Sequence, residues 1–149
     1  MPELCLDQIY IDTDGSINGC EFLSVIRARS QSPSRSFSLT SCVPIPEHLS
    51  SDPCRPDGWC HWELVNWGAM WDMSFRTKEP YVDCNGNGIT IIGETPWTPP
   101  AVAFDRLAAA FPSISIRLIW EVPDMRGGII WKGAARIHEW ERSTVDDIY

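Results

Sequence analysis

The stretch that decides the fold is Ile114-Ser-Ile-Arg-Leu-Ile-Trp-Glu-Val122. Its apolar and polar residues alternate, with Ile119 as the one interruption, and a period of two is typical of a strand with one buried face. The turn residues Asp124-Met-Arg-Gly-Gly128 follow and predict a reversal into a last strand over 129–137. The end of the chain is therefore expected to form an antiparallel pair with one face against the core.

Upstream of this pair, short strands and helices follow one another. Apolar spacing predicts strands at 4–12, 37–43, 70–76 and 89–94, and helices at 17–29, 59–67 and 100–110. Ser16 is the predicted N-cap of the first helix, and Asn85-Gly-Asn-Gly88 is the predicted hairpin turn. Antiparallel strands with helices covering one face make an α+β sandwich. Residues 1–149 are expected to form a single domain with a polar tail at 143–149, because the sequence has no repeats and no long interior linker.

Charge and hydropathy narrow the classes of partner. Twenty acidic residues against twelve basic ones give a net charge of -8, which disfavours direct nucleic-acid binding. An acidic surface suits docking on a basic protein, although mild acidity also serves solubility alone. The apolar runs are too short to span a bilayer, and the N-terminus carries no basic signal region. We expect a cytoplasmic location and no contact with membranes.

The cysteines and the catalytic motifs predict neither a metal site nor an enzyme. Without a secretory signal, the six cysteines are expected to be reduced, buried thiols. No Cys-x-x-Cys pair exists, and the spacing of Cys54, Cys60, His61 and Cys84 fits no common zinc site. No nucleophile elbow, His-x-x-x-His pair or phosphate-binding glycine loop is found. No cofactor is expected.

Eight tryptophans are present, and four of them lie between Trp59 and Trp71. One interpretation places Trp67 and Trp71 in the core, with Trp97 as a lid and Asp72 or a carbonyl accepting an indole N–H. A second makes them a nucleotide site with Asn66, Arg76 and Lys78. A third makes them a surface for binding a protein. Trp59 and Trp140, at the edges of elements, are the tryptophans expected to be exceptions to a structural role.

Five landmarks occur together in this chain. They are Pro-x-x-Cys at 2–5, Val43-Pro-Ile-Pro-Glu47, Trp62-Glu-Leu-Val-Asn-Trp-Gly-Ala-Met-Trp-Asp72, Thr95-Pro-Trp-Thr-Pro-Pro100 and Phe111-Pro112. From Pro2 to about Gly133 the chain resembles the YubB-like family of phage, plasmid and prophage proteins. It departs from that family at Met70, where a lysine is usual, and at Leu4, where an aromatic residue is usual. The resemblance implies a ferredoxin-like α+β fold, carriage on mobile genetic elements and no established activity.

Three functions are in competition. The leading hypothesis is a phage or mobile-element counter-defence protein that binds a host immune effector, such as a CRISPR complex or nuclease, in a fixed ratio. Its acidic side chains would occupy a basic groove, with candidate contacts at Asp12, Asp14, Asp52, Asp57, Glu139, Glu141, Asp146 and Asp147. The first alternative is a binder that sequesters a nucleotide immune signal, and the second is a nucleotide-directed enzyme.

Overall fold

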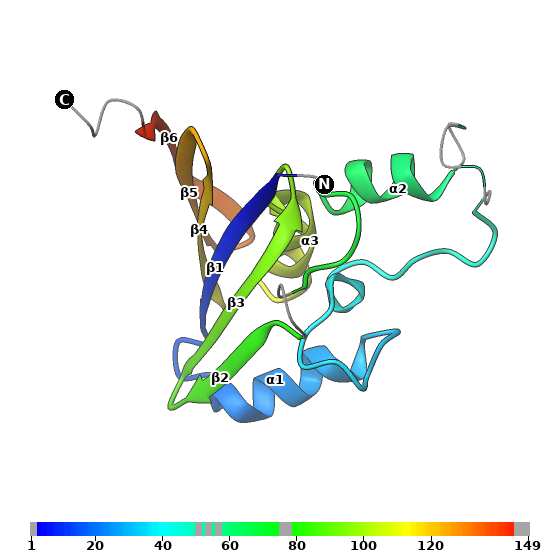
Figure 1. Cartoon of the computed structure of the whole chain (residues 1–149). Helices are drawn as coiled ribbons and strands as arrows, with labels where there is room; N and C mark the ends of the chain where they lie inside the picture. The colour runs from blue at the N-terminus through cyan, green and yellow to red at the C-terminus, as the bar shows by residue number, and fades with distance from the viewer. Residues whose placement is uncertain (1–2, 50–51, 53–54, 56–57, 75–78, 145–149) are drawn as a thin grey trace.

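A computed structural model describes residues 3–49, 52, 55, 58–74 and 79–144. Within this part the chain forms six strands, three α-helices and a 3-10 helix (Figure 1). In order they are β1 (Leu4–Asp12), α1 (Gly19–Ala28), η1 (Leu39–Ser41), α2 (Trp59–Asn66), β2 (Tyr81–Asn85), β3 (Gly88–Pro96), α3 (Ala101–Ala110), β4 (Ser115–Val122), β5 (Met125–Lys132) and β6 (Ala135–Ser143).

The sheet has the ferredoxin-like arrangement with two strands added. Its order is β2-β3-β1-β4-β5-β6, and each neighbouring pair is antiparallel. The elements β1-α1-β2-β3-α3-β4 form two interlocked split βαβ units, in which β1 lies between β3 and β4. Strands β5 and β6 extend the sheet beyond β4. The predicted α+β class and ferredoxin-like topology are confirmed.

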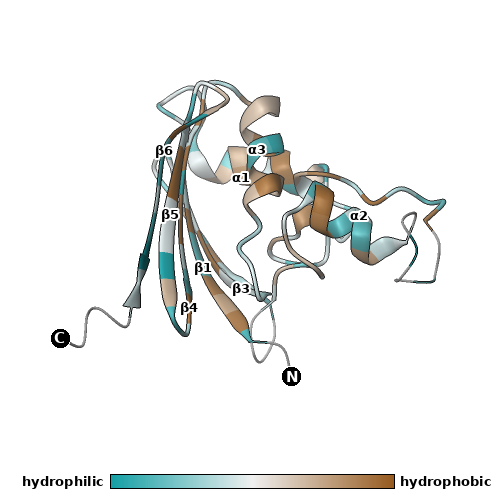
Figure 2. Ribbon diagram, turned by 90° about the horizontal axis from the view of Figure 1, so that it is seen from above, coloured by the Kyte–Doolittle hydropathy of each residue, from teal (hydrophilic) through white to brown (hydrophobic). Residues whose placement is uncertain are grey.

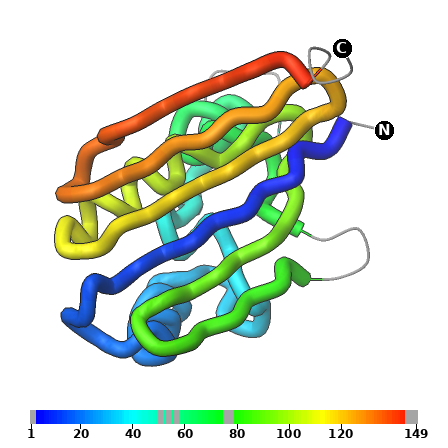
Figure 3. The backbone as a smooth tube through the Cα atoms, turned by 90° about the vertical axis from the view of Figure 1, so that its left-hand side faces the viewer, coloured from blue at the N-terminus to red at the C-terminus, as the bar shows by residue number. Residues whose placement is uncertain are grey.

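The helices lie on one side of the sheet. Helix α1 packs over β2 and β3, whereas α3 packs over β4, β5 and β6. Figure 3 shows the other face of the sheet, with no helix in front of it. Figure 2 shows α2 farthest from the sheet. Helix α2 contacts α3 and lies outside the two-layer part of the fold.

Alternation in β1 shows how the core is built. Cys5, Asp7, Ile9 and Ile11 are buried under the helices, while Leu6, Gln8 and Tyr10 point to the open face. The matching strand β4 buries Ile116, Leu118 and Trp120 on the same side. The predicted strands at 4–12 and 114–122 and the helices at 59–67 and 100–110 are confirmed within one or two residues.

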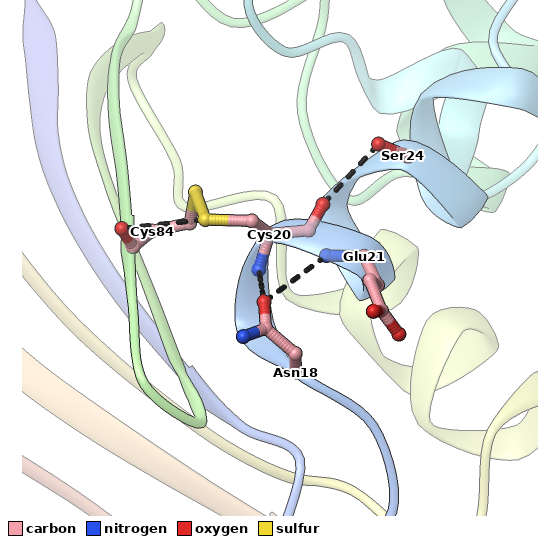
Figure 4. The surroundings of a disulfide bond; sticks show 5 residues. All are labelled: Asn18, Cys20, Glu21, Ser24 and Cys84. Atoms are coloured by element: carbon pink, nitrogen blue, oxygen red, sulfur yellow. Dashed lines mark hydrogen bonds between the residues drawn. A yellow bond between two sulfur atoms is a disulfide. The ribbon is translucent and has the colours of Figure 1, made fainter.

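Helix α1 begins two residues later than predicted. Its N-cap is Asn18, whose Oδ1 accepts hydrogen bonds from the N–H groups of Cys20 at 2.8 Å and Glu21 at 3.4 Å (Figure 4). The predicted cap, Ser16, donates instead to the carbonyl of Thr13 at 2.7 Å. Both side chains are suited to capping, and the turn after β1 decides which one is used.

Three predicted strands differ from the structure. Residues 37–43 contain the 3-10 helix η1, because Ser38 caps it by accepting from the N–H of Thr40 at 3.1 Å. The stretch 70–76 contributes a bridge between Ser74 and Glu94, and 75–76 lie outside the described residues. The hairpin at Asn85–Gly88 is formed, but its first strand is β2. The predicted strand at 129–137 is two strands, since Gly133 and Ala134 adopt positive φ angles of 60° and 69° and reverse the chain.

The expectation that all cysteines are reduced is wrong for two of them. Cys20 on α1 and Cys84 on the edge strand β2 form a disulfide, with their Cα atoms 5.2 Å apart (Figure 4). Cys5 and Cys42 are buried free thiols, as predicted, while Cys60 is partly exposed. The pairing follows from the packing of α1 on β2, which joins positions 64 residues apart.

No helix in the described part of the chain combines the length and the apolarity needed to cross a membrane.

Candidate functional site

Two exposed tryptophans lie against each other beside α2. Trp71 is 45% exposed and Trp97 is 47% exposed, and their ring centroids are 6.3 Å apart with the planes tilted by 41°. Trp71 follows α2, whereas Trp97 follows β3 directly. The interpretation that placed Trp71 in the core is therefore wrong, and Trp97 covers Trp71 rather than a buried cluster. Paired exposed indoles of this kind are typical of binding surfaces.

Both indoles are carried by strained backbone. Trp71 has φ 64° and Trp97 has φ 61°, a left-handed region that costs a bulky residue about 1 kcal/mol or more. The N–H of Trp97 donates to the carbonyl of Glu3 at 2.8 Å. The hydroxyl of Thr98 donates to the carbonyl of Gly68 at 2.8 Å and ties the two loops together. These hydrogen bonds therefore fix the backbone that carries both side chains.

Glu63 anchors the backbone of Trp71. Its Oε2 accepts the N–H of Trp71 at 2.8 Å, and the residue is only 7% exposed. Burial raises the pKa of this carboxyl, the hydrogen bond from Trp71 lowers it, and the charge of Asp72 raises it. The carboxylate of Glu63 on α2 thus fixes the backbone from which the exposed indole of Trp71 projects.

Trp97 also lines a pocket. This pocket has a volume of about 370 Å³ and lies between the segment that leads into α3 and strands β4 to β6. Its apolar lining includes Trp97, Trp120, Val122, Met125 and Ile129. Arg136, Glu139 and Glu141 supply its charged groups. Trp97 and residues from the acidic end of the chain therefore meet at one place.

The cation of this pocket is already neutralised. Arg136 binds both carboxylate oxygens of Asp105, at 2.6 and 2.7 Å, and Glu139 at 2.6 Å. These bonds raise the pKa of the guanidinium, so Arg136 stays charged and paired. The side chain of Glu141 forms no hydrogen bond or ion pair with any residue that the structure describes. The rim therefore carries a net negative charge.

Two glycines of β5 leave room for indoles of the neighbouring strands. A Cβ at Gly127 would lie 2.4 Å from the indole of Trp120, and a Cβ at Gly128 would lie 2.4 Å from that of Trp140. Each indole lies close against a strand that has no side chain at that point. Trp120 faces the helices and Trp140 faces the open side, because neighbouring residues of a strand alternate. In the sequence, the signal for this packing of indoles on β5 is the glycine pair, although the sequence alone predicts a turn there.

The remaining candidate residues divide into architecture and surface. Trp67 is buried, and its indole N–H donates to the carbonyl of Val43 at 3.0 Å, so its predicted place in the core is confirmed. Asn66 donates to the carbonyl of Trp62 at 2.9 Å. The carboxylate of Asp72 accepts hydrogen bonds from the N–H groups of Leu39 and Met73 and pairs with Arg35, so its role is structural. Trp59 and Trp140 are both partly buried, whereas Trp71 and Trp97 are exposed.

The acidic candidates are dispersed. Asp52 is exposed in the loop before α2, while Glu139 and Glu141 are exposed on β6 beside the pocket. Asp14 is exposed after β1 and accepts a hydrogen bond from Ser115 at 3.1 Å. Asp12 caps that turn by accepting from the N–H of Asp14 at 2.7 Å. Five candidates lie outside the described residues: Asp57, Arg76, Lys78, Asp146 and Asp147.

A metal site has no support among the described residues. No group of three His, Cys, Asp or Glu side chains converges there. Of the cysteines considered for zinc, Cys84 is in the disulfide and Cys54 is outside the described residues.

Comparison with known proteins gives little. No family model matches the sequence, and no curated protein matches it. One similar solved structure is the crystal structure of protein api92 from Yersinia pseudotuberculosis, of the family DUF1281. The similarity covers 57% of this chain and 30% of that chain, with 19% identity and a TM-score of 0.48. The site must be interpreted from its own geometry.

Proposed function

We propose that this chain is a binding protein that inhibits a partner protein in a fixed ratio through the Trp71–Trp97 pair and the acidic rim beside it. In keeping with the family resemblance, the proposed setting is phage or mobile-element counter-defence in the host cytoplasm. The proposed partner is a host immune effector with a basic groove, such as a CRISPR complex or nuclease. The observation that carries the proposal is a pair of indoles that are 45% and 47% exposed. Their backbone has positive φ angles and is fixed by hydrogen bonds to Glu63 and Glu3.

Preorganised indoles are suited to tight association. A tryptophan buries a large apolar area while it loses few rotamers, which is why it is enriched among the residues that dominate binding energy. Here the hydrogen bonds to Glu63 and Glu3 fix both backbones before any partner arrives. Association therefore costs less ordering entropy than it would with mobile loops.

The charges favour a basic partner. The chain carries a net charge of -8, and the pocket rim has two glutamates against one arginine that is already paired. Like-signed charge would oppose a phosphate at this rim. The nucleotide-binding alternative has less support for that reason.

Capture and stoichiometry test the proposal together. Tagged protein is used to isolate partners from host lysate, and the purified complex is weighed by light scattering. We expect a complex of fixed ratio that is lost in the double variant Trp71→Ala/Trp97→Ala. Tyr81→Ala is the matched control, because Tyr81 is 52% exposed on the open face of the sheet. A captured protein that binds the double variant and the wild type equally would refute this surface.

Salt provides a second test on the same complex. Rim charges steer association and are screened beyond a distance of about 8 Å at physiological ionic strength. We therefore expect the association rate to fall as salt rises, with a smaller change in the dissociation rate. Identical association rates at low and high salt would remove the acidic rim from the proposal and leave the indoles.

A further inference from the structure

We infer that the pocket beside Trp97 binds the side chain of one arginine of the partner protein, with its guanidinium against the indole of Trp97 and paired with the carboxylate of Glu141. This inference rests on the proposed function and specifies the chemistry that the partner presents. Three observations carry it: the aromatic lining, the carboxylate at the rim and the size of the pocket.

The lining suits a flat cation with an apolar stem. Trp97 and Trp120 contribute indoles, and Val122, Met125 and Ile129 contribute aliphatic surface. An indole face attracts a cation through its quadrupole, and a guanidinium stacks on it better than an ammonium does. The methylene groups of arginine would bury against the aliphatic side chains.

The fold already contains one arginine in an environment of this kind. Arg136 lies 5.8 Å from the ring centroid of Trp131 while it binds the carboxylate of Asp105 with two hydrogen bonds. Glu141 lines the same pocket and offers a second carboxylate, with no partner among the described residues. An incoming guanidinium would supply the donors that this carboxylate lacks.

Size and charge select the occupant. A volume of about 370 Å³ lies near the lower end of the range for ligand pockets, roughly 300–1,000 Å³, and suits a single long side chain. An anionic ligand would face Glu139 and Glu141. A neutral apolar side chain would fill the lining but would make no ion pair with the carboxylate of Glu141. An arginine satisfies both the apolar lining and the carboxylate.

Two blocked peptides that differ at one atom group test the inference directly. The probe is N-acetyl-Gly-Arg-Gly-amide, and the control is the same peptide with citrulline, which keeps the shape of arginine and removes its charge. Binding is followed by NMR through the indole N–H signals of the folded protein. We expect the arginine peptide to shift the signal of Trp97 and to bind about threefold to tenfold more tightly than the citrulline peptide, as expected for a cation–π contact with an ion pair.

Two pocket variants and one control locate the binding. Glu141→Gln is expected to weaken arginine binding about threefold to tenfold while it leaves citrulline binding unchanged. Trp97→Leu is expected to weaken arginine binding by a similar factor. Glu121→Gln, an exposed acid on β4 outside this pocket, is the control and is expected to bind like the wild type. Preserved dispersion of the amide spectrum confirms that each variant is folded.

The outcomes separate this inference from the proposed function. Equal binding of the two peptides, no detectable binding of either, or full binding by both pocket variants overturns the arginine site. If partner capture still depends on Trp71 and Trp97 in that case, the proposed function stands without it. If the arginine peptide binds as expected but no protein is captured, the site stands and the proposed function fails.

Discussion

The carboxyl group of Asp7 on β1 lies 2.7 Å from the hydroxyl of Thr95 on β3, and both residues are fully buried. The same hydroxyl lies 2.7 Å from the carbonyl of Thr98. A hydroxyl has one hydrogen to donate, and a carbonyl only accepts. If Thr95 donates to Thr98, Asp7 must be protonated and donate to Thr95. The protonation of Asp7 is thus linked to the turn that carries Trp97.

The surroundings of Asp7 support the protonated form. Burial raises its pKa to about 8 from an ordinary value of 3.8, the hydrogen bonds with Thr95 and Cys5 lower it, and the nearby charge of Glu94 raises it. The Cys5 thiol donates to the other carboxyl oxygen at 3.3 Å, and its own pKa is raised by burial and by Asp7. At neutral pH Asp7 is therefore mainly neutral.

The first prediction is a loss of stability as the pH rises. Because the folded pKa of Asp7 lies above the unfolded value, the folded state binds the extra proton between about pH 4 and pH 8. The contribution of Asp7 is complete below pH 4 and is lost as the pH rises through 8, with a slope of up to about 1.4 kcal/mol per pH unit. Urea unfolding measured from pH 5 to about pH 9 checks this.

Asp7→Asn isolates this contribution from the other carboxylates. An amide can donate to Thr95 at every pH, so the difference between the wild type and the variant should shift in favour of the variant as the pH rises. A difference that stays constant from pH 5 to about pH 9 would mean that Asp7 does not titrate in this range.

The second prediction contrasts Trp67 with Trp71. Trp67→Ala should lower the free energy of unfolding by about 3–5 kcal/mol, because it empties a buried aromatic site and leaves the carbonyl of Val43 unpaired. Trp71→Ala should cost less than about 1 kcal/mol, because that indole is 45% exposed. Equal losses in urea melts of the two variants would contradict the assignment of Trp71 to the binding surface.

The third prediction concerns the disulfide. The bond between Cys20 and Cys84 closes a long loop, so Cys20→Ser/Cys84→Ser should lower the free energy of unfolding by about 2–4 kcal/mol. A reducing agent should lower the stability of the wild type by a similar amount and leave the double variant unchanged. Peptide mapping under non-reducing conditions should recover the linked peptides. Finding both cysteines alkylated in protein unfolded without reductant would show that the bond does not form.

The fourth prediction tests Asp72 as structure rather than interface. Its Oδ1 accepts from the N–H groups of Leu39 and Met73, both at 2.7 Å, while Arg35 approaches its Oδ2 to 2.8 Å. Asp72→Ala should cost about 2–4 kcal/mol, since it leaves buried donors and a partly buried cation without a partner. Asp83→Asn, on the exposed side of β2, is the control and should be neutral within about 0.5 kcal/mol. Loss of partner binding without loss of stability in Asp72→Ala would return Asp72 to the interface.

The sequence pattern predicted those strands and helices whose formation depends mainly on neighbouring residues. The alternation at 114–122 and the apolar spacing in 101–110 depend on which side of one element faces the core, so they could be recognised without the fold. Residues 37–43 show the opposite case. Their composition suits a strand, but Ser38 caps a 3-10 turn that Asp72 holds by accepting from Leu39, and this partner lies 33 residues away.

The site could be predicted only in part, for the same reason. The aromatic block at 62–72 marked the region, yet the exposure of Trp71 depends on Glu63, Gly68 and the turn of Thr98. Nothing in the sequence places Trp97 beside Glu139 and Glu141. Their meeting requires β6 to return along β5, which in turn requires the reversal at Gly133 and Ala134.

By itself, the sequence determined the α+β class, the strands and helices with clear periodicity, the acidic character and the burial of Trp67. These properties follow from the composition and spacing of neighbouring residues. Only the tertiary structure decided the division of 129–137 between two strands, the Cys20–Cys84 bond, the neutral Asp7 and the exposed indole pair. Each of these depends on groups far apart in the chain, and their energies exist only after the sheet has set its register and the helices have packed on it.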